Sequence, residues 1–552
     1  MSVAAAPDAG TVGGARAWAL NPVVAGYALA VVGYLATRLA LVWRLPWHYD
    51  ESVFAGWTLQ GYENVDSRFL PLASGQQTLL EWLGMIGMRL GLEPVTSLRF
   101  VSVSAGLATL VLVAMLARRL AGEPAGVAAA VLYVVLPYTL VYSVAGLYDP
   151  LAAMLVVAAL LLQIEIAERP RLGLSLLLGL VLAAALLTKL TATIALYLLP
   201  LSAIAFDWSP EARPRRLAAW LGSILVALLI AWLGSRILHL SDLNDDLQPA
   251  RDALLGDHGL REGLGSLSHW VAQNGPAYSW ALVAYVTPVV FIAAIIGAVA
   301  GIRRTPRRTA IVVAWVVLPY VAVIVLASFP AIRWLLVAVP PLEALAGVGV
   351  VAVCAHAREL GRTPRSSTWF AVGAVGVLVL PAVAFSGRIL AGPSTAWYPG
   401  RDRFEFTDGA AWAHASSAIG RLAAGRPMQV VIAGYGADQP RLHLRSATNI
   451  TLVEQGTAPA DGALYLLQYG IEPAPRPAGL GWRQVGRFPA AAGRDPVLLF
   501  RSAGVANGRT ATSAAELRAA IGGSDADYDA FVAAHPAVKT WLEALLRAEE
   551  PQ

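Results

Sequence analysis

The hydrophobic pattern of the chain consists of apolar runs of about twenty residues separated by short polar segments. A run of this length spans the hydrocarbon core of a bilayer, which is about 30 Å thick. We predict about eleven membrane-spanning helices: 23–43, 96–117, 125–144, 150–167, 172–188, 190–206, 217–238, 279–302, 309–328, 333–355 and 369–390. The pattern therefore predicts a polytopic, all-α membrane domain over residues 23–390, preceded by a cytoplasmic N-terminal tail of residues 1–22.

The first long polar loop, 44–95, contains a second kind of pattern between residues 76 and 90. Apolar and polar side chains separate there onto two faces of a helix, which is typical of a helix lying in the membrane interface. The apolar face consists of Leu79, Leu80, Trp82, Leu83, Ile86 and Leu90, and the polar face of Gln77, Glu81 and Arg89.

The pattern changes again after residue 390. Short β-type runs at 429–435, 449–454, 463–469 and 497–501 alternate with turn residues, and 407–424 has the periodicity of an amphipathic helix. We predict an extracytoplasmic α/β domain over 391–504, which we expect to shape acceptor binding. A helical C-terminal tail is predicted over 505–552.

Composition indicates a membrane protein, and the placement of arginine predicts its orientation in the membrane. The chain is 57% hydrophobic and only 14% charged, which excludes a soluble enzyme. Arginines cluster in alternate loops, so those loops are expected in the cytoplasm and loops 44–95, 145–149, 239–278 and 329–332 outside. The arginine-rich loops are Arg118–Arg119, Glu165–Arg171, Arg213–Arg216, Arg303–Arg308 and Arg358–Arg365.

This topology predicts a multi-pass protein of the plasma membrane with a cytoplasmic N-terminus and an extracytoplasmic C-terminal domain. The net charge of +5 serves topology, so no nucleic-acid partner is expected. The single cysteine, Cys354, excludes an intrachain disulfide. Only two of the 41 basic residues are lysines, which together with the excess of Ala and Gly indicates a bacterial genome rich in GC.

Charged residues gather at the outer ends of the predicted spans, where each one is costly and needs an explanation. They are Asp50, Glu51, Arg99, Asp149, Lys189 and Arg333. A carboxylate can accept a hydroxyl proton, and Lys and Arg can hold a phosphate as its charge grows. The set therefore suits a reaction in which a base removes a proton and an anionic group leaves.

Structural explanations for the same residues stay open. Arg99 can extend along its span to the interface, and Asp149 can cap the helix that begins at Pro150. Lys189 and Arg333 can be structural or interfacial residues, and Asp50–Glu51 can be the solvated start of a loop. The outer histidines lack metal-ligand spacing and no phosphate-binding glycine loop is present, so we predict neither a metal nor another cofactor.

Five short motifs carry a resemblance to a known family. They are Tyr49-Asp50-Glu51, Leu98-Arg99-Phe100-Val101-Ser102, Tyr148-Asp149-Pro150-Leu151, Leu186-Leu187-Thr188-Lys189 and Phe329-Pro330-Ala331-Ile332-Arg333-Trp334. In this order, the set resembles the C-type superfamily of membrane glycosyltransferases, in particular the branch of protein O-mannosyltransferases and the lipid A aminoarabinose transferase. Two departures are Ser74-Gly75-Gln76-Gln77, where many members have a Pro-rich basic segment, and Trp334, where Tyr is usual.

The resemblance implies a polyprenyl-phosphate-linked sugar as donor and an extracytoplasmic glycan, lipid or protein as acceptor, at the surface of a lipid bilayer. It implies Asp50 as the base and Lys189 and Arg333 as phosphate contacts. Glu51 and Asp149 are the other candidate catalytic carboxylates, with Glu51 orienting the acceptor or the loop, and Arg99 is a third candidate phosphate contact.

Two other functions fit the same sequence. A transporter or flippase of lipid-linked sugars also needs many spans and buried charges, but it predicts charges deep within spans and a path to both faces. A non-catalytic scaffold of the cell envelope predicts that Asp50 can be replaced freely. Because the charges gather at the outer rim, the sequence disfavours a transporter. The resemblance implies an inverting hexosyl- or pentosyltransferase.

Overall fold

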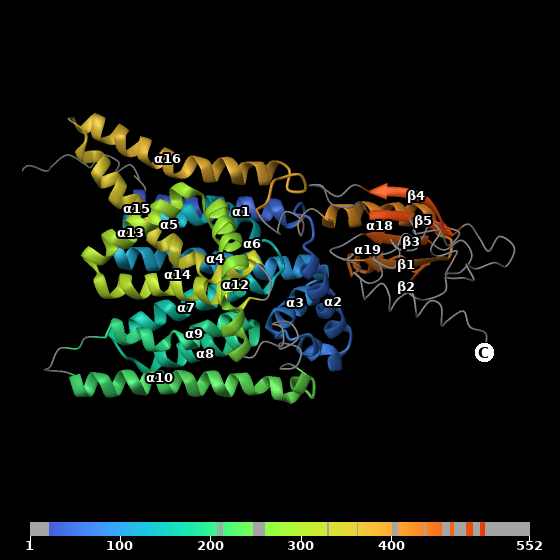
Figure 1. The fold of residues 1–552 in the computed structure, drawn as a ribbon, viewed down its shortest axis with the longest axis horizontal. Helices are drawn as coiled ribbons and strands as arrows, with labels where there is room; N and C mark the ends of the chain where they lie inside the picture. Colours follow the sequence, from blue (N-terminus) through green and yellow to red (C-terminus); the bar gives the residue numbers. More distant parts are fainter. Residues whose placement is uncertain are drawn as a thin grey trace, which may run out of the picture.

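The computed structural model describes residues 21–206, 208, 213–246, 260–327, 331–361, 363–399, 406, 408–434, 438–454, 464–468, 482–488 and 497–502. Long helices lie nearly side by side along the longest axis of the molecule (Figure 1). A mixed sheet stands beyond one end of this bundle, next to α2 (Tyr49–Glu63) and α3 (Leu79–Arg89). The predicted helical tail 505–552, and residues 1–20 of the predicted cytoplasmic tail, lie outside the described residues.

Seven of the described helices are long and apolar enough to cross a membrane. They coincide with predicted spans because about twenty consecutive apolar residues form a helix whose polar backbone is satisfied internally. These helices are α1 (Pro22–Val42), α4 (Pro94–Ala121), α7 (Tyr148–Glu168), α10 (Arg213–Ser235), α14 (Pro306–Leu326), α15 (Val339–Glu359) and α16 (Pro364–Ala391).

The predicted number of eleven spans is not confirmed, because the other four apolar runs are short or broken. Helix α12 (Leu260–Val286) meets α13 (Pro288–Arg304) at a bend of 94°, so the predicted span 279–302 is wrong as a single helix. Proline lacks the N–H that would continue α12. Together these two helices form at most an eighth span.

The remaining short helices pack inside or beside the bundle. The run predicted as 125–144 divides at Pro137 into α5 (Glu123–Val135) and α6 (Pro137–Tyr142). The run 172–188 forms α8 (Leu172–Thr188), and 190–206 folds into the short helices η2 (Leu190–Thr193), α9 (Ile194–Tyr197) and η3 (Leu199–Ile204). The span predicted at 333–355 begins with the 3₁₀ helix η6 (Ile332–Val337) before α15.

Helices α7 and α15 are the most enclosed spans. In their most apolar stretches, 78% of α7 and 67% of α15 is buried, against 22% of α10 and α16, which lie at opposite edges of the bundle (Figure 1). Glycine permits the close approach of α15 to α13, since a Cβ on Gly297 would lie 2.7 Å from the backbone nitrogen of Gly349. Such small residues let membrane helices pack backbone to backbone. The first residues of α7 and α15 therefore lie in the centre of the bundle.

The first outer loop folds into α2, the 3₁₀ helix η1 (Val65–Ser74) and α3. Helix α3 lies where the amphipathic helix was predicted, but two of the three residues of the predicted polar face turn toward the protein, and only Arg89 is exposed. Gln77 and Glu81 are buried, whereas Ile86 and Leu90 are exposed. The arrangement follows from the membrane setting, in which apolar side chains are compatible with lipid and a carboxylate needs protein partners.

The domain predicted over 391–504, called the outer domain below after its predicted side of the membrane, has a sheet with strand order β2-β1-β3-β5-β4. Strands β1 (Met428–Gly434), β2 (Ile450–Glu454) and β3 (Leu464–Gln468) are parallel, and β5 (Val497–Ser502) pairs antiparallel with β3 and with β4 (Trp482–Phe488). The sequence pattern did not predict β4. Helices α18 (Asp408–Ala423) and α19 (Asp438–Leu444) complete this part, and the Trp412 side chain of α18 is fully buried in its core.

Candidate active site

Four of the six predicted site residues form a continuous chain of opposite charges. Arg333 Nη2 lies 2.5 Å from Asp50 Oδ2, and Arg333 Nε lies 3.9 Å from Asp149 Oδ2. Asp149 Oδ1 in turn accepts a hydrogen bond of 2.7 Å from Lys189 Nζ. The chain brings together residues from the start of α2, the start of α7, the end of α8 and η6.

Local structure holds each of these side chains in place. Asp50 and Asp149 lie in the first turns of α2 and α7, where the positive end of the helix dipole favours a carboxylate. Helix α7 begins at Tyr148 with Leu147 in the capping position, so Asp149 lies within the first turn and is not the cap of a helix that begins at Pro150. Lys189 has extended backbone dihedrals that end α8, and the backbone next to Arg333 is tied by the hydroxyl of Tyr138, which donates to the Ile332 carbonyl at 2.5 Å.

The exposure of the two carboxylates differs in a way that bears on their roles. The Asp149 side chain is 3% exposed and the Asp50 side chain 22% exposed. A base that takes a proton from an incoming hydroxyl must be reachable by the acceptor. Asp50 meets that condition, whereas Asp149 is enclosed and suited to holding Lys189 and Arg333.

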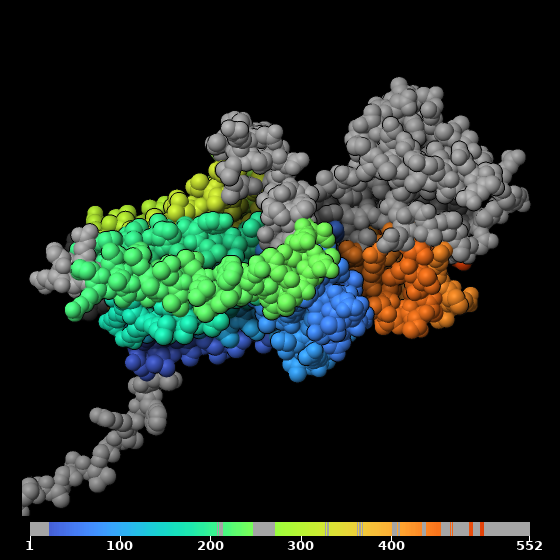
Figure 2. All heavy atoms as spheres, turned by 90° about the horizontal axis from the view of Figure 1, so that it is seen from below, coloured from blue at the N-terminus to red at the C-terminus, as the bar shows by residue number. Residues whose placement is uncertain are grey.

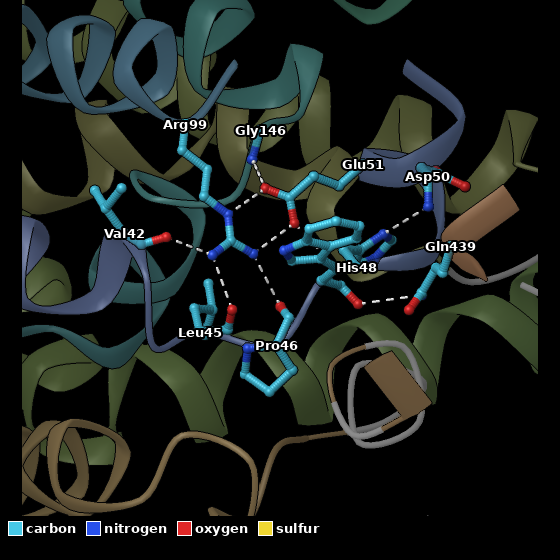
Figure 3. Close-up of polar contacts among 10 residues, drawn as sticks. Val42, Leu45, Pro46, His48, Asp50, Glu51, Arg99, Gly146 and Gln439 are labelled. Atoms are coloured by element: carbon cyan, nitrogen blue, oxygen red, sulfur yellow. Dashed lines mark hydrogen bonds and ion pairs between the residues drawn. The ribbon is translucent and has the colours of Figure 1, made fainter. Parts of the chain in front are cut away.

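Glu51 and Arg99 form a separate, fully buried ion pair beside this chain. Arg99 Nε donates to Glu51 Oε1 at 2.6 Å and Nη2 donates to Oε2 at 2.8 Å, a two-point contact that fixes both groups (Figure 3). The remaining donors of Arg99 bond the carbonyls of Val42, Leu45 and Pro46. The Glu51 carboxylate also accepts from the backbone N–H groups of Gly146 and His48.

Because all their hydrogen-bonding groups are engaged, Glu51 and Arg99 are poorly suited to the roles suggested by the sequence, a catalytic carboxylate and a phosphate contact. Every N–H group of the Arg99 guanidinium is engaged, so none is left for a phosphate. Glu51 has no exposed side-chain surface and no reach to an incoming acceptor. The geometry favours a structural role for this pair, which ties the end of α1, the start of α2 and α4 together.

His48 is a site residue that the sequence reasoning missed. It caps α2, because its Nδ1 accepts the backbone N–H of Asp50 at 3.1 Å, and its Nε2 lies 3.5 Å from Arg333 Nη1. The spacing His48-x-x-Glu51 resembles a capping box, in which the residue three positions on bonds back to the capping backbone. That spacing is the signal in the sequence that could have identified His48.

Glu81 is the second residue missed, since it was assigned to the solvated face of an interfacial helix. Its Oε1 accepts a hydrogen bond from the hydroxyl of Tyr148, next to Asp149 in the chain, while Oε2 is buried without a hydrogen-bond partner. Burial raises the pKa of Glu81 to about 8. The Glu81 carboxyl is therefore expected to be protonated at neutral pH, next to the Tyr148–Asp149 segment.

We expect this carboxyl to make the protein less stable as the pH rises. The folded protein keeps a proton on Glu81 that the unfolded chain loses near pH 4.5, so stability declines up to about pH 8 and then levels off. Glu81→Gln keeps an acceptor for Tyr148 and should remove that decline, raising stability at pH 8.5 by about 2–5 kcal/mol relative to the wild type. Melting temperatures of both proteins between pH 5 and 9 measure the effect, and parallel curves would contradict it.

The described residues contain no group of three His, Cys, Asp or Glu side chains that could hold a metal ion. The acids of the site are instead neutralised by arginine and lysine.

Comparisons with known proteins agree with this architecture. A sequence model of the family "dolichyl-phosphate-mannose-protein mannosyltransferase" matches residues 78–233, which contain Arg99, Asp149 and Lys189. No curated protein sequence matches the chain.

Solved structures share the fold at low sequence identity. ArnT from Cupriavidus metallidurans bound to undecaprenyl phosphate aligns with a TM-score of 0.53 and 16% identity, over 89% of this chain and 99% of ArnT. The apo state of the same protein gives a TM-score of 0.52 and 17% identity, over 87% and 97%.

The apo oligosaccharyltransferase of Archaeoglobus fulgidus is a third structure of this kind. It aligns with a TM-score of 0.51 and 14% identity over 79% of this chain, which spans 64% of the archaeal protein's length. Together, the family model over residues 78–233 and the fold shared with these structures agree with the resemblance of the chain to the C-type superfamily of membrane glycosyltransferases.

Proposed function

We propose that the protein is an inverting glycosyltransferase that moves a sugar from a polyprenyl-phosphate donor to an acceptor hydroxyl on the extracytoplasmic side of the membrane. The observation that carries this proposal is the Asp50–Arg333–Asp149–Lys189 chain, in which a reachable carboxylate adjoins two cationic groups. A base and a phosphate-binding pair at one place are the two requirements of such a transfer.

The reaction assigns a step to each group. The acceptor oxygen attacks the anomeric carbon, a new C–O bond forms, and the bond between that carbon and the phosphate oxygen breaks. The hydroxyl proton passes to Asp50, and the electron pair leaves with the lipid phosphate, whose growing charge is held by Arg333 and Lys189. Asp149 remains paired with Lys189 and keeps the two cations close together.

The position of Arg333 suits this sequence of events. It contacts Asp50 at 2.5 Å and approaches Asp149 at 3.9 Å, so a small movement shifts its charge from the base toward the leaving group. A donor phosphate that competes for Arg333 also releases the Asp50 carboxylate to accept a proton. Donor binding then prepares the base for the acceptor.

The likeness to known proteins supports the class of donor. One ArnT structure with this fold holds undecaprenyl phosphate, and the matching family is described by a dolichyl-phosphate-linked sugar. The arginine-rich loops support the proposed side of the membrane, because loops of this kind are favoured in the cytoplasm and the starts of α2 and α7 lie at the opposite ends of the predicted spans. A hexose or a pentose fits the same chemistry.

If Lys189 and Arg333 hold the lipid phosphate, Lys189→Ala and Arg333→Ala should each weaken donor binding by about one to two decades. A charge-assisted contact of this kind contributes roughly 1.5–3 kcal/mol. Lys189→Arg should restore binding only in part, since a planar guanidinium does not replace a compact ammonium. Donor affinity is measured with a labelled polyprenyl-phosphate sugar.

The control is Arg118→Ala, because Arg118 is an exposed arginine paired with Glu123 at the opposite end of α4. Lys189→Ala also leaves Asp149 without its close partner, so the melting temperature of each variant accompanies the affinity. Wild-type donor affinity in both alanine variants would reduce the two residues to a structural role.

The activity itself is tested by incubating the purified protein with a panel of polyprenyl-phosphate sugars and mixed envelope acceptors. Release of free polyprenyl phosphate is followed with and without acceptor, and Asp50→Asn serves as the inactive control. Acceptor-dependent release from one donor supports the proposal. No release from any donor, with donor binding intact, would contradict it.

A further inference from the structure

The outer domain contacts the short segment 46–48 that connects α1 to the first turn of α2. The imidazole of His443 stacks on the indole of Trp47, with ring centres 3.9 Å apart and planes inclined by 7°. Gln439 Nε2 donates to the carbonyl oxygen of Trp47 at 3.4 Å (Figure 3). Both residues belong to α19, so one helix of the outer domain holds the side chain and the backbone of Trp47.

Helix α18 holds the same residue from another direction. A Cβ on Gly409 would lie 2.8 Å from the backbone nitrogen of Trp47 and would overlap its carbonyl oxygen. Only glycine permits this approach, because the atoms it would meet belong to backbone and cannot rotate away. Phe406, just before α18, places its ring against His48 with centres 5.1 Å apart.

The space-filling view shows how extensive this contact is. The outer domain, in orange, lies directly against the first outer loop, in blue (Figure 2), and helices α19 and α2 pack together. A second contact joins Arg445, just after α19, to Glu93, just before α4. The outer domain therefore rests on the elements that carry Asp50 and Arg99.

The residue after Trp47 connects this contact to the chain of charges. His48 is fully buried, holds the backbone N–H of Asp50 and lies beside Arg333. The residue before Trp47 contributes the Pro46 carbonyl to Arg99. Segment 46–48 thus lies between the outer domain and both groups of charges.

Burial keeps the stacked imidazole neutral, since it lowers the pKa of His443 to about 4. A neutral ring stacks on indole without the cost of removing a charge from water. Its Nε2 is buried without a hydrogen-bond partner, so packing against Trp47 is the contact that explains the residue.

We propose that Gly409, Gln439 and His443 act as a clamp on Trp47 that fixes the first turn of α2, and with it the Asp50 carboxylate, relative to Arg333. The clamp residues are positioning residues, since none of them reaches the reacting atoms. The expected effect of the clamp on turnover rests on the proposed function, whereas its effect on the position of the first turn of α2 does not. The outer domain then contributes to the transfer step itself, beyond the acceptor binding expected from the sequence.

Two glycines of α18 provide a matched test. Gly409→Ala introduces a methyl group against the Trp47 backbone, whereas Gly420→Ala on the same helix meets nothing within 4 Å. Both substitutions replace a glycine of the same helix by the better helix former alanine, and only the one at Gly409 introduces a contact with Trp47. Hydrogen exchange of the peptide over residues 44–54 reports directly on the first turn of α2.

We expect Gly409→Ala to speed exchange in that peptide by about tenfold or more and Gly420→Ala to leave it unchanged. Turnover should fall by up to about a hundredfold in Gly409→Ala, the scale expected from a displacement near 1 Å. Donor affinity should stay within about twofold, since this prediction concerns orientation, which affects turnover more than binding. A general loss of folding would instead lower both quantities together.

A second pair of variants applies if Gly409→Ala does not fold. His443→Phe keeps a planar ring on Trp47 and should retain slow exchange and turnover, whereas His443→Ala should lose both. Unchanged exchange in Gly409→Ala and His443→Ala, or equal effects of Gly409→Ala and Gly420→Ala, would overturn the clamp. If the wild type transfers no sugar, the proposed function fails while the exchange data still test the clamp.

Discussion

Replacing Asp50 by Asn is expected to lower turnover by about two to four decades while leaving donor binding nearly intact. A positioned base contributes about this much to a proton transfer, and the amide keeps the size and hydrogen-bonding ability of the side chain but not its basicity. Asp50 is the more exposed carboxylate of the charge chain and lies against Arg333 at 2.5 Å. Steady-state release of polyprenyl phosphate and equilibrium donor binding measure the two quantities separately.

Asp149, the buried carboxylate among the four linked charges, supplies the comparison. Asp149→Asn should disturb Lys189 and Arg333, and therefore donor affinity, more than it disturbs the transfer step. An Asp50→Asn protein that turns over at nearly the wild-type rate, beside an inactive Asp149→Asn protein that binds donor normally, would assign the base to Asp149.

Glu51→Gln is expected to lose activity because the folded protein becomes less stable, although Glu51 is adjacent to Asp50 in the sequence. Removing one partner of a buried ion pair typically costs about 3–5 kcal/mol, because the other charge stays buried without compensation. Here that charge is Arg99, and two backbone N–H groups also lose a charged acceptor. Melting temperature and the folded fraction after purification should fall together, with donor binding and turnover lost in proportion.

Arg99→Lys tests the same pair from the other side. Lysine keeps the charge but cannot reproduce the two-point contact with Glu51 together with the bonds to three carbonyls, so an intermediate loss of stability is expected. A Glu51→Gln protein with the melting temperature of the wild type and no turnover would contradict the structural role and make Glu51 a catalytic residue.

Figure 3 explains why the two adjacent acids differ. The Glu51 carboxylate points to Arg99 and Gly146, whereas Asp50 lies on the far side of the first turn of α2, toward the outer domain. Consecutive residues at the start of a helix point about 100° apart, since 3.6 residues complete a turn. One side chain therefore enters the bundle while its neighbour faces the site.

The sequence by itself determined the class of protein and the location of most long helices. Helices α1, α4, α7, α14 and α16 lie within a few residues of the predicted spans, because the length and composition of an apolar run are local properties that a bilayer selects directly. It also carried the resemblance to a glycosyltransferase family, since each of the five motifs is a few consecutive residues that can be compared without knowing what they contact.

Only the tertiary structure decided which charges meet. Asp50 and Arg333 are 283 positions apart in the chain, and Glu51 and Arg99 are 48 apart. Apart from the family resemblance, the six charges could not be distinguished in the sequence, because a charge at the end of a span carries the same local signal whether it faces water, a partner or a substrate. The break between α12 and α13, the burial of Gln77 and Glu81, and the contact of the outer domain with Trp47 were equally hidden. Each depends on a neighbour brought close by folding, and hydrophobic periodicity contains no information about which neighbour that will be.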